Sequence, residues 1–230
     1  MMSEESNFDL SKLTFEEFER FFFDRPIIRQ SKGKYFDTVF CPEMFSFASS
    51  RPEVTVASLE RMFKEFERIG GQYTLKQINQ GIWALLGPTI EIQEHLWNAT
   101  ISLADRVLCL RSMLVPYRDF VCGHPVKEME NCFDMWWDMV ASSFWMPMKK
   151  KDPKSLNEDQ RVLLDGMFAT LCDILQLPDL RCRAYALHGL GHLHHPGVRG
   201  VVQKYIDKNR KNWRPENVRW VERCRDGTVM

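Results

Sequence analysis

The sequence predicts an all-α protein built from stacked antiparallel helix pairs. Apolar residues recur at three- and four-residue spacing along most of the chain, and Pro or Gly ends most of these segments. The one short β-like run has no evident partner strand. Because the connections between periodic segments are short, neighbouring helices are expected to be antiparallel. The arrangement is predicted to be either an α-solenoid or an irregular helical bundle.

Composition excludes several classes of protein. The 230 residues are 44% hydrophobic and 27% charged, and 31 Lys and Arg balance 31 Asp and Glu. This neutral total argues against a whole-protein field that attracts nucleic acid or an anionic membrane. No apolar stretch approaches the length of a membrane span, and the acidic start is unlike a signal sequence. We expect a cytoplasmic protein that does not bind membranes.

The cysteines support this expectation. Their number is odd, seven, and none forms a CxxC pair. A disulfide framework and a cysteine-rich zinc site are therefore both disfavoured, and free thiols in a reducing compartment are expected. Charge is unevenly distributed, because residues 1–19 are mainly acidic and residues 199–226 mainly basic. These ends either face each other, within the fold or between protomers, or are solvated.

The periodic segments predict eight or nine helices, at residues 13–23, 54–71, 73–86, 90–114, 125–144, 157–177, 181–194 and 198–209, with a short last one starting near residue 215. Thr14 and Asn157 are predicted N-caps, since acidic residues follow each in the first turn. Residues 25–52 contain the β-like run YFDTVF and are predicted to form a loop or one helical turn. We expect one folded unit, in which residues 1–52 pack on a helical domain of residues 53–230.

The stretch LPDLRCRAYALHGLGHLHHPGVRGVVQKYI resembles a HEAT-type repeat. Pro178 and Asp179 stand at the turn and Arg181 follows, then an Ala-x-x-x-Leu-like inner helix, then a helix with paired valines. The resemblance covers residues 157–209. It implies a curved stack of helix pairs that serves as a protein-binding scaffold, and some bacterial members of the family bind nucleic acid. It carries over no catalytic residue, because the matching positions are packing positions.

Four of the six histidines lie in the stretch AYALHGLGHLHHPGV, residues 184–198. On a helix that continues to residue 195, His188, His192 and His195 lie within about 60° of each other, and His194 points elsewhere. Three neutral imidazoles on one face are a candidate zinc site. A metal-dependent helical enzyme that uses these three histidines is therefore one alternative.

Neighbouring residues argue against a familiar metalloenzyme pattern. The position where a zincin carries its general base is Gly189. A carboxylate would have to come from elsewhere, for example from the acidic row of Glu130, Asp134 and Asp138, or His124 would have to approach. The preferred interpretation of the histidines is helix packing and capping beside a leucine seam, in which Gly189 and Gly191 let a neighbouring helix approach closely. The preferred interpretation of the acidic row is a solvated helix face.

The main functional hypothesis is a non-enzymatic adaptor or regulatory protein that binds another protein through a helical-repeat surface. No cofactor is predicted. Aromatic residues are enriched at binding hot spots, and methionines form adaptable surfaces. The candidate partner-binding residues are Trp136, Trp137, His188, His192 and His195.

The C-terminal segment offers a further alternative, a nucleic-acid-binding surface. Basic residues interleaved with aromatic ones suit single strands, because phosphates pair with the cations and bases stack on the rings. The candidate residues are Arg210, Lys211, Trp213, Arg214, Arg219 and Arg223. The competing interpretation, which is favoured, is a terminal helix that packs its tryptophans inward and exposes its arginines.

Overall fold

The computed structural model describes residues 8–27, 47–86, 92–124, 130–148 and 150–229, and these residues are predominantly helical. The all-α prediction is confirmed. The α-helices are α1 (Phe15–Phe23), α2 (Pro52–Lys64), α3 (Phe66–Gly70), α4 (Leu75–Leu86), α5 (Leu103–Ser112), α6 (Glu130–Trp145), α7 (Glu158–Leu175), α8 (Leu180–Leu193), α9 (Val198–Asn209) and α10 (Pro215–Asp226). A two-residue parallel pair, β1 (Phe8–Asp9) and β2 (Phe47–Ala48), joins the N-terminal segments.

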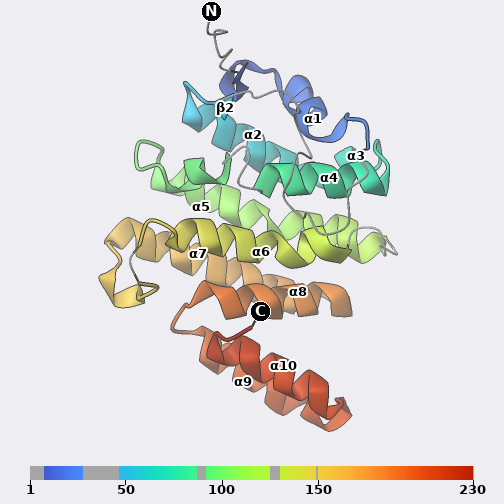
Figure 1. Ribbon diagram of the computed structural model, residues 1–230, viewed down its shortest axis with the longest axis vertical. Coiled ribbons are helices and arrows are strands. Elements are labelled where there is room, and N and C mark those ends of the chain that lie inside the picture. The colour runs from blue at the N-terminus through green and yellow to red at the C-terminus, as the bar shows by residue number, and fades with distance from the viewer. Residues whose placement is uncertain (1–7, 28–46, 87–91, 125–129, 149, 230) are drawn as a thin grey trace, which may run out of the picture.

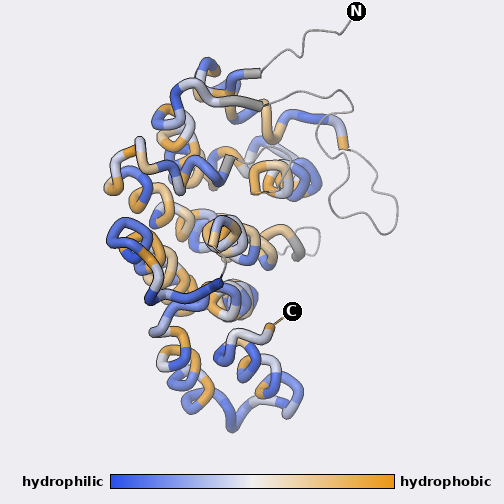
Figure 2. The backbone as a smooth tube through the Cα atoms, turned by 60° about the vertical axis from the view of Figure 1, so that its left-hand side comes forward, coloured by the Kyte–Doolittle hydropathy of each residue, from blue (hydrophilic) through white to orange (hydrophobic). Residues whose placement is uncertain are grey.

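The helices form two rows along the long axis of the molecule (Figure 1). In one row α4, α6, α8 and α10 contact each other in turn, and in the other α2, α5 and α7 do so. Contacts between α7 and α8 join the two rows, and α9 packs on α10 at the C-terminal end. The turned view in Figure 2 shows the same succession from the N-terminal to the C-terminal end. The acidic helix α1 and the basic helices α9 and α10 therefore lie at opposite ends and do not face each other within one chain.

Side-chain caps fix where several helices begin. Thr14 and Glu17 form a reciprocal capping box at the start of α1, as Asn157 and Gln160 do at the start of α7. Each box satisfies backbone N–H groups that would otherwise lack a partner in the first helical turn. The two predicted N-caps are thus confirmed.

The long helix predicted for residues 90–114 is wrong. A 3₁₀ helix, η2 (Ile92–Trp97), is followed by a turn and then by α5. The Asn98 side chain accepts hydrogen bonds from the backbone N–H and hydroxyl of Thr100, and Ser102 caps α5. These local bonds compete with the helical ladder and break it.

Other boundaries also differ from the prediction. The helix predicted for residues 54–71 is two helices that meet at Glu65. After α5 the chain does not leave helical geometry at Pro116, since a π-helix, η3 (Pro116–Phe120), and a 3₁₀ turn, η4 (Val121–Gly123), follow. Short 3₁₀ helices occupy Leu10–Lys12 (η1), Pro153–Ser155 (η6) and Arg210–Asn212 (η7). The YFDTVF run and the start of the helix predicted for 125–144 lie outside the described residues.

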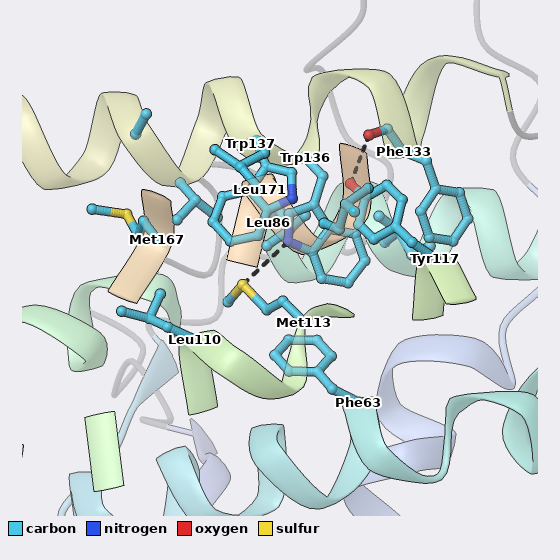
Figure 3. Packing of buried hydrophobic residues seen from close by; sticks show 14 of the residues in the cluster. Phe63, Leu86, Leu110, Met113, Tyr117, Phe133, Trp136, Trp137, Met167 and Leu171 are labelled. Carbon is cyan, nitrogen blue, oxygen red and sulfur yellow. Dashed lines mark hydrogen bonds between the residues drawn. The ribbon is translucent and has the colours of Figure 1, made fainter. Parts of the chain in front are cut away.

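The core is aromatic and centres on α6 (Figure 3). The Trp136 indole N–H points at the Met113 sulfur at 3.4 Å, and the Phe63 ring lies 5.3 Å from the Trp136 ring. The Tyr117 hydroxyl donates to the Phe133 carbonyl at 2.8 Å. Burying an N–H or hydroxyl group that has a hydrogen-bond partner costs little free energy. Burial of the apolar area of these rings therefore stabilises the fold.

Helices α6 and α8 come unusually close at Gly189. A Cβ atom at this position would lie 2.5 Å from the Trp137 Cβ and 2.9 Å from the Leu171 Cδ2. Gly191 similarly lets α10 approach, because a Cβ there would lie 3.1 Å from the Cys224 Cα. The glycines of the histidine-rich stretch are therefore packing positions, as the sequence indicated.

Two further findings concern the cysteines and the length of the apolar helices. The six cysteines in the described part of the chain are free thiols. Among the helices described here, none is long and apolar enough to cross a membrane.

The close contact at Gly189 predicts the effect of adding one methyl group. Gly189→Ala should destabilise the fold by about 1–3 kcal/mol, because neither backbone can move away without opening the core. Gly200→Ala is the control, since a Cβ at Gly200 meets nothing within 4 Å, and it should stabilise helix α9 by about 0.5–1 kcal/mol. Urea unfolding of both variants measures the difference. Equal midpoints would contradict the packing assignment.

Candidate functional site

The histidine-rich helix α8 ends one residue before the predicted position. Asp179 caps its start by accepting from the Arg181 backbone N–H, and His194 terminates it in the left-handed region, at φ 54°. The carbonyl of Leu193, at the last turn, accepts a hydrogen bond from the Trp145 indole at 3.0 Å. The helix therefore ends before His195, which lies off its helical face.

Two histidines of α8 face two aspartates of α6. His188 Nδ1 lies 3.0 Å from the Asp134 Oδ1, and His192 Nδ1 lies 3.1 Å from the Asp138 Oδ1. The two imidazoles meet each other, with 3.1 Å between their Nε2 atoms. We call these four residues the His–Asp chain. The acidic row is therefore not a plain solvated face, because Asp134 and Asp138 pair with histidines.

The spacing of the His–Asp chain explains why it forms. Both aspartates and both histidines are four residues apart, which places each pair on one face of its helix. Because α6 and α8 run in the same direction, the two pairs meet in register, Asp134 with His188 and Asp138 with His192. The matching spacing in DMWWD and HGLGH is a signal that sequence reading could have used. The packing partner of α8 was not known from sequence.

The surroundings shift the two imidazole pKa values in opposite directions. Burial lowers the pKa of His188, but the hydrogen bonds and charge of Asp134 outweigh it, so this pKa is raised above 6.5. Burial also lowers the pKa of His192. There the positive neighbours His188, Lys151 and His194 add to burial and outweigh Asp138, so the pKa falls below 6.5. The pair thus favours one proton at the pH where an isolated histidine is half protonated.

His195 belongs to a different contact. Its Nε2 lies 2.8 Å from the Asp165 Oδ1 of α7, its Nδ1 accepts from the Gly197 N–H at 3.0 Å, and its ring stacks on Phe168 at 4.0 Å. Both ring nitrogens are thus used, and the ring is turned toward α7 rather than α6.

The predicted metal triad does not assemble. His188 and His192 converge on α6, whereas His195 is held on α7. In the part of the chain that the structure describes, no group of three His, Cys, Asp or Glu side chains is arranged to hold a metal. The physical reason is the helix end at His194, which rotates the chain before residue 195.

The prediction that the two tryptophans bind a partner is wrong. Trp136 and Trp137 are both 0% exposed and lie in the aromatic core. His188 is also buried, while His192 and His195 are half-buried. Helical spacing does not show which neighbouring helices cover the two tryptophans. In the structure α2, α5 and α8 cover them.

The basic C-terminal residues are exposed. This holds for Arg210, Lys211, Arg214, Arg219 and Arg223. Trp213 is half-buried and packs on the Tyr205 ring at 5.5 Å, while Val218 and Val221 face inward. The terminal helix therefore packs apolar residues inward and exposes arginines.

A groove that sequence analysis did not assign lies beside the end of α6. Its volume is about 600 Å³, and three of its lining residues are methionines. It is lined by Leu86, Gln93, Glu94, Met139, Ser142, Ser143, Trp145, Met146, Met148, Lys150 and Lys151. The concentration of methionines beside tryptophans was the available signal, but it fits a soft core equally well.

No protein-family model, curated protein or solved structure matches this chain. The HEAT-like resemblance and the functional hypotheses built on it therefore stay predictions.

Burial of the tryptophans predicts a structural rather than a binding phenotype. Trp136→Ala should cost about 3–5 kcal/mol of stability, because a large cavity forms between α2, α5 and α6. Met146→Ala is the control, since Met146 is 68% exposed, and it should change stability by less than about 0.5 kcal/mol. Urea unfolding measures both. A Trp136→Ala loss as small as that of the control would contradict the burial.

Proposed function

We propose that this protein is a non-enzymatic adaptor that binds a protein partner in the methionine-lined groove, on a HEAT-like stack of helix pairs. The two rows of helices support the stack, because α4, α6, α8 and α10 contact one another in turn and because α7 pairs with α8 and α9 with α10. The groove is the observation that carries the proposal.

The groove has the chemistry of a site for an apolar side chain. Met139, Met146 and Met148 line it, and Met146 is among the most exposed large hydrophobic residues described. Methionine side chains adapt to the shape of an inserted partner, which is why they recur at such surfaces. Apolar exposure of this kind favours an anchor residue from another protein.

Gln93 adds a polar requirement. It is 8% exposed and lines the groove, and its Nε2 donates to the Leu86 carbonyl at 2.9 Å. Its Oε1 has no hydrogen-bond partner among the described residues. A buried acceptor without a partner costs about 1–3 kcal/mol, so a side-chain shift that exposes this oxygen to a donor from a bound peptide backbone would recover that energy.

Positive charge at the rim of the groove favours a partner that carries acidic residues. Lys150 and Lys151 are both exposed and line the groove. An acidic residue beside the apolar anchor would pair with them. The proposed occupant is therefore a segment of another protein with an apolar anchor, flanked by Asp or Glu.

Selection from a displayed peptide library tests the groove directly. Wild-type protein should enrich peptides with one apolar anchor beside acidic residues, and Met146→Lys should weaken their binding by about tenfold or more. Leu180→Lys is the matched control, because Leu180 is 74% exposed and starts α8 outside the groove. Equal loss in both variants, or no enriched peptide, would contradict the proposal.

A second candidate function is single-stranded nucleic-acid binding at the C-terminal end. The favouring observation is that Arg210, Lys211, Arg214, Arg219 and Arg223 are exposed, and none has an ion pair to a residue described in the structure. Free cations gathered at one end offset the neutral total charge locally.

Fluorescence anisotropy with a labelled single-stranded oligonucleotide tests this candidate. Binding at low salt should fall steeply as salt is raised, and Arg219→Glu/Arg223→Glu should abolish it. Lys12→Glu/Lys76→Glu makes the same charge change at the opposite end of the stack and should bind normally. Absence of any low-salt binding, or loss in both variants, would eliminate the candidate.

A further inference from the structure

The His–Asp chain restricts how many protons its two imidazoles carry. His188 Nδ1 lies 3.0 Å from the Asp134 Oδ1 and 3.1 Å from the Asp134 backbone carbonyl oxygen, and both oxygens only accept hydrogen bonds, so this nitrogen carries a proton. His192 Nδ1 lies 3.1 Å from the Asp138 Oδ1, where an unprotonated nitrogen would set its lone pair against a carboxylate, so the charge of Asp138 favours a proton on this nitrogen as well. A neutral imidazole has no second ring proton. If both rings were neutral, two Nε2 lone pairs would face each other across 3.1 Å. If both were cationic, two N–H bonds would collide there.

One additional proton satisfies the contact. Placed between the two Nε2 atoms, it makes one ring a cation that donates and leaves the other ring a neutral acceptor. The opposite shifts of the two pKa values agree with this count, since one site holds its proton more tightly and the other resists a second proton. The single positive charge lies between two carboxylates.

The groups that face the pair do not supply another proton switch. From α6 they are Asp134 and Asp138, and from the segment after α6 it is Lys151, which opposes a second positive charge. Tyr185 and Cys224, near Asp134, both have their pKa raised to about 12, mainly by burial. They stay neutral at every pH where histidine titrates.

His194, from the end of α8, also acts on the pair. Burial and the charge of Lys151 lower the pKa of His194, so it too stays mainly neutral at the ordinary histidine pKa. Two titrating groups, His188 and His192, therefore govern the contact near neutral pH.

We propose that His188 and His192 share one proton, and that this proton stabilises the contact between α8 and α6 until acidification adds a second proton. The second proton comes from solvent and bonds to the Nε2 lone pair of the neutral ring, which ends the Nε2–Nε2 hydrogen bond. No other bond changes. The two cations then repel, and His192, the more exposed ring, turns away from its neighbour.

A proton explains the contact better than a metal ion. The described residues supply no third ligand, since His195 is held by Asp165. The Lys151 ammonium also raises the local positive potential. The site thus favours a single charge over a dication.

The stability of the fold should depend on pH with a maximum near 6.5. The raised pKa of His188 gives stability that is present below 6.5 and is lost as pH rises through its folded value. The lowered pKa of His192 costs stability as pH falls from 6.5 toward its folded value, because the unfolded chain then binds more protons. Urea midpoints measured from about pH 5 to about pH 8 should rise and then fall.

NMR titration of the imidazole nitrogens tests the shared proton. In the wild-type protein His188 should titrate above 6.5 and His192 below it, in two separate steps. His192→Asn keeps a donor toward Asp138 but removes Nε2, so the pKa of His188 should fall. His195→Asn is the control and should leave both steps unchanged.

Three results would overturn the proposal. One is a common titration of both rings near 6.5 in the wild-type protein, a measurement that needs no variant to fold. Another is an unchanged His188 titration in His192→Asn. The third is a rise in the melting temperature of chelator-treated protein on adding ZnCl₂ that His192→Asn abolishes, which would assign the contact to a metal ion.

Discussion

The close contact between α6 and α8 at Gly189 sets the position of the other features described above. Because Gly189 has no side chain, Trp137 lies directly against the α8 backbone. This approach encloses both tryptophans in the aromatic core and brings polar side chains of the two helices within hydrogen-bond distance. Asp134 and Asp138 then lie 3.0 and 3.1 Å from His188 and His192. Packing of apolar residues therefore creates the polar contact, and not the reverse.

Helix α6 connects the core, the His–Asp chain and the groove. One side carries Trp136 and Trp137, and another carries the two aspartates. The hydroxyl of Ser142, a groove residue, donates to the Asp138 Oδ1 at 3.2 Å. The proton balance of the histidines and the shape of the proposed partner site are thus separated by a single side chain. Ion pairs at the surface, by comparison, contribute little to either feature because solvent screens them.

Local signals predicted well where the determining atoms are close in sequence. Thr14 and Asn157 cap their helices through residues three positions away, which a reader of the sequence can check. The break after η2 also has a local cause, but it was missed because apolar periodicity continues across Asn98 and Ser102. Polar side chains that bond to their own backbone override such periodicity. A count of apolar residues does not detect them.

The sequence by itself determined the helical class, most helix positions and the role of Gly189 and Gly191 as packing residues. These follow from propensity and spacing within one segment. Only the tertiary structure decided that Trp136 is buried, that His195 pairs with Asp165, and that α6 is the helix facing His188. The reason is that a helix presents several faces, and its sequence does not say which neighbour covers each one. Residues 134 and 188 become partners only because two intervening turns return the chain in the same direction.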